Sequence, residues 1–152
     1  MKKTFTKEDI IKKHQTNVKS AASSFILAGI LGLIYIVRYF ISENFNFHFS
    51  LAFTEWMLRL TDAGSLPKAA AIALVAVYVI IFAVIAVLVA KNAKNLIFAF
   101  CFYAVDALCL VGVGLFHGAS LEPAFFIDVI LHLFLFVFLI VGMKSERALR
   151  KG

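Results

Sequence analysis

Four long runs of apolar residues divide this chain, and shorter polar segments, most of them basic, separate the runs. A helix needs about 20 predominantly apolar residues to cross the hydrocarbon core of a bilayer, and each run has that length. Backbone groups must be hydrogen-bonded within lipid, and the runs lack the alternation of a barrel strand, so we expect helices. The pattern predicts membrane-spanning helices at about residues 21–41, 69–90, 96–116 and 124–143.

The composition places the whole chain in the membrane class. Hydrophobic residues make up 62% of the 152 positions, and 17 of them are Phe, whereas soluble domains average about 45–50% apolar residues. We therefore expect one membrane domain over residues 1–152. The first run is expected to stay as a helix and not to be removed as a signal peptide. A polar segment precedes it, and it exceeds the ~7–15 apolar residues of a signal sequence.

Basic residues are distributed unevenly about the four runs. Twelve Lys and Arg lie before the first run, between the second and third, or after the fourth, whereas only Arg38, Arg59 and Lys68 lie on the other side. Short loops rich in Lys and Arg face the cytoplasm. The sequence thus predicts that both termini and the Lys91–Asn95 loop are cytoplasmic. Nucleic-acid binding is not indicated, because no stacking or groove-reading motif accompanies the charge.

The first outer connection contains a second kind of pattern. Between about residues 49 and 60, apolar side chains recur at spacings of three and four, opposite a polar face that includes Thr54, Glu55 and Arg59. This pattern predicts a short amphipathic helix at the membrane interface. A lid over the outer mouth of the bundle, or a surface for another membrane protein, are the alternatives. The expected fold is therefore all-α, an antiparallel four-helix membrane bundle with an interfacial helix in the first outer loop.

Small residues form a regular seam on the second run. Ala69, Ala76, Ala83 and Ala90 recur at seven-residue intervals, and small residues let membrane helices approach closely. Packing within the chain's own bundle is the first interpretation. The alternative is a homodimer, or contact with another membrane protein, through this seam or through the Phe49–Leu60 face.

Polar groups from all four runs fall at similar depths. With a rise of ~1.5 Å per residue, Asp106 and His132 lie near the same level, and Tyr78 and Tyr35 lie close to it. An ionisable residue within a membrane span is a functional-site hypothesis by default. The candidate ligand-binding residues are Asp106, His132, Asp128, Tyr103, Tyr78, Tyr35, His117 and Arg38.

Two interpretations of this layer remain open. In the structural one, Asp106 bonds to His132 or a Tyr and Asp128 pairs with Arg38, which fixes helix register. In the functional one, the layer lines an outer-half pocket that binds a small ligand, a metal or a proton. Asp106, Asp128 and His132 are the candidate metal ligands, although no fingerprint such as HExxH supports them. The sequence names no catalytic residue and leaves any cofactor unknown. An intramembrane enzyme is a third option.

The second half of the chain carries a resemblance. Tyr103-Ala-Val-Asp106-Ala-Leu108, followed by a His in a Phe-rich fourth run that ends in Gly142 and a basic tail, resembles a group of small four-span bacterial membrane proteins. The resemblance implies the bacterial plasma membrane and implies no activity. The leading functional expectation is a ligand- or proton-binding membrane protein, with a role in transport as one form of it. Its alternative is an accessory subunit of a larger membrane complex in which the polar layer is purely structural.

Overall fold

The computed structural model describes residues 6–41, 51–116 and 123–151, and no strand occurs among them. Four long helices, α1, α3, α4 and α5, are each long and apolar enough to cross a membrane, as predicted. The remaining elements are a short helix, α2, and one 3-10 turn, η1. Their bounds are α1 Lys7–Ile41, α2 Ala52–Asp62, α3 Lys68–Lys91, η1 Ala93–Asn95, α4 Leu96–Phe116 and α5 Pro123–Lys151.

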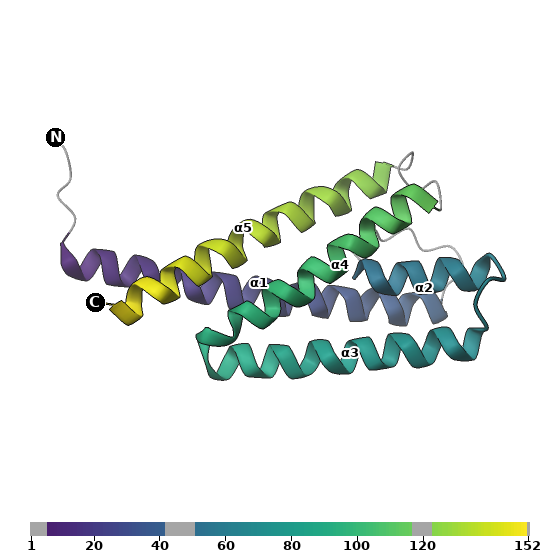
Figure 1. Cartoon of the computed structure of the whole chain (residues 1–152), viewed down its shortest axis with the longest axis horizontal. Coiled ribbons are helices and arrows are strands. Elements are labelled where there is room, and N and C mark those ends of the chain that lie inside the picture. The colour runs from purple at the N-terminus through teal and green to yellow at the C-terminus, as the bar shows by residue number, and fades with distance from the viewer. Residues whose placement is uncertain (1–5, 42–50, 117–122, 152) are drawn as a thin grey trace.

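The four long helices extend along the long axis of the molecule, with α4 and α5 inclined to α1 and α3 (Figure 1). The start of α1, the end of α5 and η1 lie at one end, which we call the terminal end. The opposite end, where α1 stops and α3 starts, we call the far end. Large apolar side chains are exposed on all four long helices, as expected where the solvent is lipid.

The α1–α5 pair forms the most extensive helix interface. Gly142 of α5 lies directly against the side chain of Ala21 on α1, where an added Cβ would collide with it. Nearer the terminal end, the Ser145 hydroxyl lies 3.1 Å from Nδ1 of His14 and accepts a 3.0 Å hydrogen bond from Asn17. Close backbone approach and a small polar cluster therefore join the two helices.

The start of α1 carries a capping box. Thr6 Oγ1 accepts from the backbone N–H of Asp9 at 3.2 Å, and Asp9 Oδ2 accepts from the Thr6 backbone N–H at 3.1 Å. These bonds satisfy N–H groups that the first turn of a helix leaves without partners.

The helix α2 occupies the segment where a short amphipathic helix was predicted. Its contacts also show where it lies relative to the long helices. Its first turn packs beside the middle of α4, and its last residue, Asp62, accepts a 2.8 Å hydrogen bond from Tyr39 near the end of α1. Thus α2 runs along the bundle from mid-height to the far end. The expectation that Thr54 faces outward was wrong: its side chain is fully buried, because α2 packs against α3 and α4.

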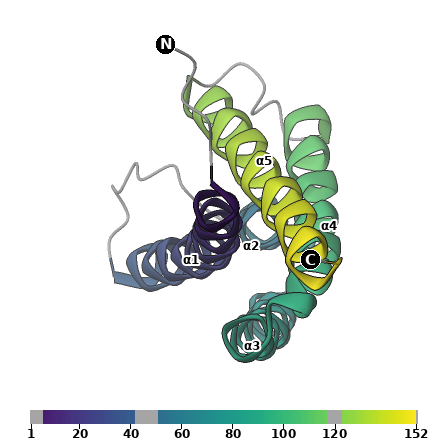
Figure 2. The same cartoon turned by 90° about the vertical axis from the view of Figure 1, so that its left-hand side faces the viewer.

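The alanine seam does not pack within the chain. Ala69, Ala76, Ala83 and Ala90 are all exposed, so the first interpretation of the seam was wrong. The face that α3 buries contains larger residues instead, among them Val75, Tyr78 and Phe82. Burying these aromatic and branched side chains removes more apolar surface than burying alanines would. Viewed along the long axis, α3 lies at the edge of the assembly (Figure 2).

Candidate functional site

Asp106 occupies the middle of α4, ten residues from each end and therefore about 15 Å from either. Its side chain is fully buried. Oδ2 accepts from the backbone N–H of Ala52, and Oδ1 from that of Phe53, both at 3.0 Å. The residue before α2, Leu51, has no side chain that could cap it. Asp106 therefore caps α2 from another helix, where a negative charge also complements the helix dipole.

Tyr78 of α3 supplies a third donor. Its hydroxyl donates to Asp106 Oδ1 at 2.6 Å. The Tyr78 ring is stacked between Phe53 and Phe102, with centroid distances of 4.4 and 4.6 Å. The ring contacts fix the hydroxyl's position, so α3 is tied to the same carboxylate that caps α2.

His132 of α5 completes the group. Nε2 lies 3.1 Å from Asp106 Oδ2, and Nδ1 lies 2.8 Å from the backbone carbonyl oxygen of Asp128. Tyr103 stacks on the imidazole with a centroid distance of 4.8 Å and an angle of 16°. The structure thus brings Asp106, Tyr78 and His132 into one hydrogen-bonded group, with Tyr103 packed against it. The Asp106–His132 and Asp106–Tyr contacts of the structural interpretation are present.

The side chains of the other predicted site residues take no part in this hydrogen-bonded group. The Asp128 side chain is buried, and its Oδ1 has no hydrogen-bond partner within the described part of the chain. The charges that act on Asp128 most closely are those of Glu55, Asp106 and Arg59, and no Asp128–Arg38 ion pair occurs among the described residues. Arg38 is exposed on α1, and His117 lies outside the described residues.

Tyr35 is half-buried on α1 and lies in the electrostatic neighbourhood of Glu55, Arg59 and Asp128. Glu55 and Arg59 form an ion pair of 2.8 Å along α2. A second polar group, nearer the far end, therefore adjoins the first through Asp128.

The Asp106 group can take part in little further chemistry, because the acceptor positions of its carboxylate are already occupied. Four donors already converge on two carboxylate oxygens, which leaves little acceptor capacity for a ligand. Among residues 6–41, 51–116 and 123–151, no three His, Cys, Asp or Glu side chains are arranged to hold a metal ion. The weak metal candidates Asp106, Asp128 and His132 thus do not form a ligand set. The arrangement is suited to holding a proton and to fixing helices.

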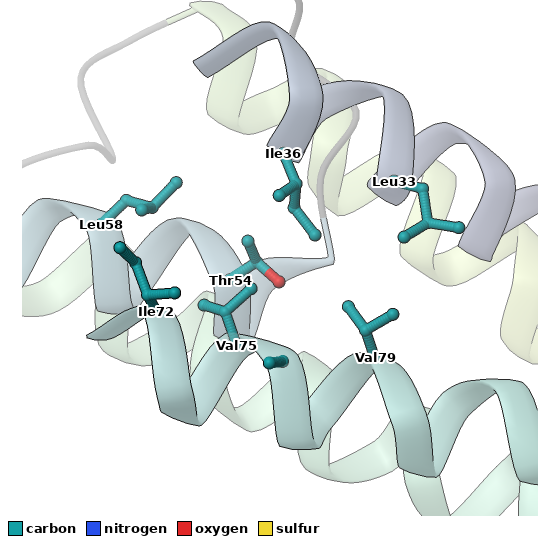
Figure 3. Close-up of a pocket in the computed structure, with 8 residues that line it drawn as sticks. Leu33, Ile36, Thr54, Leu58, Ile72, Val75 and Val79 are labelled. Atoms are coloured by element: carbon teal, nitrogen blue, oxygen red, sulfur yellow. The ribbon is translucent and has the colours of Figure 1, made fainter. Parts of the chain in front are cut away.

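An apolar cavity lies beside the group. It has a volume of about 240 Å³ and lies between α1, α2 and α3 (Figure 3). Sequence reasoning did not anticipate it, because its lining residues lie on three helices whose relative rotation periodicity does not give. They are Leu33, Ile36, Thr54, Leu58, Ile72, Val75, Ala76 and Val79.

Sequence reasoning also missed the strongest contacts of Asp106, which are to backbone N–H groups. A backbone donor has no side-chain signature. The available signal was indirect: α2 starts after Leu51, a residue that cannot cap, and a carboxylate in the membrane needs donors. Comparison with models of protein families, with curated proteins and with solved structures found no match for this chain.

Proposed function

We propose that the chain is a multi-pass protein of the bacterial plasma membrane that holds a proton on the Asp106–His132 pair and uses it to seat α2. The four apolar helices are compatible with a polytopic membrane protein. The excess of Lys and Arg at the terminal end supports an orientation with both termini cytoplasmic and the far end outside. In this orientation the helices form an antiparallel membrane bundle, and α2 occupies its outer half.

The hydrogen-bond pattern of His132 carries the proposal. Nδ1 faces a carbonyl oxygen, which can only accept, so Nδ1 must bear a hydrogen. Nε2 and Asp106 Oδ2 face each other at 3.1 Å, and a hydrogen bond between them requires one more proton. That proton resides either on Nε2, giving imidazolium and carboxylate, or on Oδ2, giving two neutral groups. Both arrangements leave the pair with zero net charge.

Loss of this proton would place a lone pair opposite a carboxylate in a low-dielectric environment. The lone pair and the carboxylate repel each other, so the two side chains are expected to move apart, and the carboxylate to shift away from the N–H groups of Ala52 and Phe53. Among the described residues, the titratable groups next to the pair are Tyr78 on α3, Tyr103 and Cys109 on α4, and Asp128 on α5. Proton binding at the pair would thus control whether α2 stays seated, which defines a proton-responsive membrane protein.

The test is histidine-selective 15N NMR of the protein in lipid nanodiscs, with His132→Gln to assign the signal. We expect Nδ1 of His132 to be protonated throughout the range in which α2 is protected from hydrogen exchange. We expect α2 to keep its protection while the pair keeps its proton, and to lose it when the pair loses that proton. Asp128→Asn should leave both changes in place. Exchange of α2 that does not follow the protonation of the pair would refute the proposal.

A second candidate function, an accessory subunit that docks another membrane helix, is favoured by the exposed alanine seam. The four seam alanines are exposed, although Ala76 also lines the apolar cavity, and α3 buries the smallest share of its span among the four long helices, 22%, inside the structure. Small residues support close helix pairing in lipid, where the hydrophobic effect does not drive association.

Cysteine cross-linking in membranes distinguishes the two candidates. Cys101 is exposed, so the experiment uses a Cys101→Ser background. Ala83→Cys should cross-link to a partner helix if α3 docks one, whereas Val84→Cys, on a neighbouring exposed position, should not. A linked dimer identifies a second copy, and a linked product of another mass identifies a different subunit. Equal behaviour of the two cysteines would refute docking through the seam.

A further inference from the structure

Thr54 differs from Thr16 and Thr61, whose hydroxyls form hydrogen bonds within their own helices. Thr16 and Thr61 each donate to the carbonyl four residues earlier, at 3.0 Å. Thr54 is the third residue of α2, so the residue four positions earlier precedes the helix. Its hydroxyl is fully buried and has no partner among the described residues. Buried polar groups normally have partners, so an unpaired one needs an explanation.

The Thr54 hydroxyl is directed into the apolar cavity between α1, α2 and α3 (Figure 3). Ile36 and Val75 flank the hydroxyl, and Leu33 and Val79 lie beyond it. Every other lining side chain is a hydrocarbon. Leu33 and Ile72, at opposite walls, are 42% and 45% exposed, so the cavity opens between α1 and α3 toward the surrounding membrane.

We propose that this cavity binds a single-chain lipophilic molecule that carries one uncharged oxygen function, a hydroxyl or a carbonyl group, and enters from the bilayer. The apolar walls suit a hydrocarbon body, and one placed polar group gives such a pocket its orientation and specificity. A hydroxyl can both donate and accept, so it matches either oxygen function. A charged head group has no counter-charge among the lining residues and is excluded by its desolvation cost.

The Thr54 hydroxyl is also held in place. The two residues before it, Ala52 and Phe53, donate their backbone N–H groups to Asp106. This fixes the first turn of α2 against α4, and with it the backbone that carries the hydroxyl. A polar group positioned by a rigid support makes a more selective contact than a mobile one.

The experiment is saturation photolabelling of the purified protein in nanodiscs with a diazirine-bearing hexadecanol, with hexadecanol and hexadecane as competitors. Labelled peptides are identified by mass spectrometry. The variants are Thr54→Val, which keeps the shape and removes the hydroxyl, and Ala76→Phe, which fills the cavity. Ala73→Phe is the control, since it lies on the same helix, is exposed, and does not line the cavity.

In the wild type we expect saturable labelling of the cavity residues, with hexadecanol competing about three- to tenfold better than hexadecane, the ratio for one hydrogen bond. Thr54→Val should abolish that preference and raise the melting temperature of the empty protein, since it removes a buried unpaired hydroxyl. Ala76→Phe should abolish the labelling, and Ala73→Phe should keep it. Labelling that is not saturable, or an equal preference for alcohol over alkane in the wild type and Thr54→Val, would overturn the proposal.

Discussion

Replacing Asp106 with alanine removes the acceptor for four donors at once. The backbone N–H groups of Ala52 and Phe53, the Tyr78 hydroxyl and the His132 ring all lose their partner. A buried donor left unsatisfied costs about 1–3 kcal/mol, so the gross penalty is about 4–12 kcal/mol. These contributions are not additive, and α2 can move, so we take the lower limit. About 4 kcal/mol corresponds to roughly a thousandfold increase in the opening equilibrium of α2.

Hydrogen exchange with mass spectrometry in nanodiscs measures this opening. The protection of the peptide that covers α2 should fall by about three orders of magnitude in Asp106→Ala, while peptides from the α1–α5 interface should keep their protection. Asp128→Ala is the matched control, because Asp128 is also a buried carboxylate, yet no side-chain hydrogen bond joins its Oδ1 to any described residue. Wild-type protection of α2 in Asp106→Ala would show that Asp106 does not hold this helix.

Three further predictions concern a buried hydrogen bond, close glycine packing and a helix cap. Tyr78→Phe should lower stability by about 1–2 kcal/mol, because its hydroxyl donates to Asp106, whereas Tyr103→Phe should not, because its hydroxyl has no partner within the described part of the chain; equal melting temperatures would contradict this. Gly29→Ala should destabilise by about 1–3 kcal/mol through collision with the Phe82 ring. Gly112→Ala, whose Cβ would meet Trp56 at 3.4 Å, should be tolerated in the same thermal assay. Thr6→Ala should speed amide exchange at Asp9, the residue its hydroxyl caps, and leave the melting temperature nearly unchanged; an unaltered Asp9 amide would rule out the cap.

The spans could be predicted from sequence because lipid imposes one requirement, about 20 apolar residues in a helix, on every one of them. The common depth of Asp106, His132 and Tyr78 followed from the helical rise alone. The rotation of a helix about its own axis was harder to predict from sequence. The interval between Ala69, Ala76, Ala83 and Ala90 identifies a face, but it does not say whether that face meets the chain's own helices or the membrane. In the structure, Tyr78 and Phe82 decide the rotation of α3.

The position of α2 could not be predicted because its amphipathic pattern fits two environments. A helix lying on a membrane surface and a helix packed into a bundle both need one apolar face. The deciding contacts are two backbone N–H groups that meet a carboxylate 53 and 54 residues later in the chain. Contacts of this kind depend on tertiary structure and leave no local trace. The cavity beside Thr54 escaped prediction for the same reason.

The distance in sequence between α2 and Asp106 also sets an order for biogenesis. Ribosomes add about 5–20 residues per second, so Asp106 is synthesised roughly 3–11 s after Ala52. Until α4 has been delivered to the bilayer, the N-terminus of α2 has no cap, and its first N–H groups must be hydrated or held by the insertion machinery. A nascent chain halted before Asp106 would therefore expose residues 52–62 to proteases and quality-control factors, and extension past α4 would withdraw them. We therefore expect α2 to be seated only after Asp106 has been synthesised and α4 inserted.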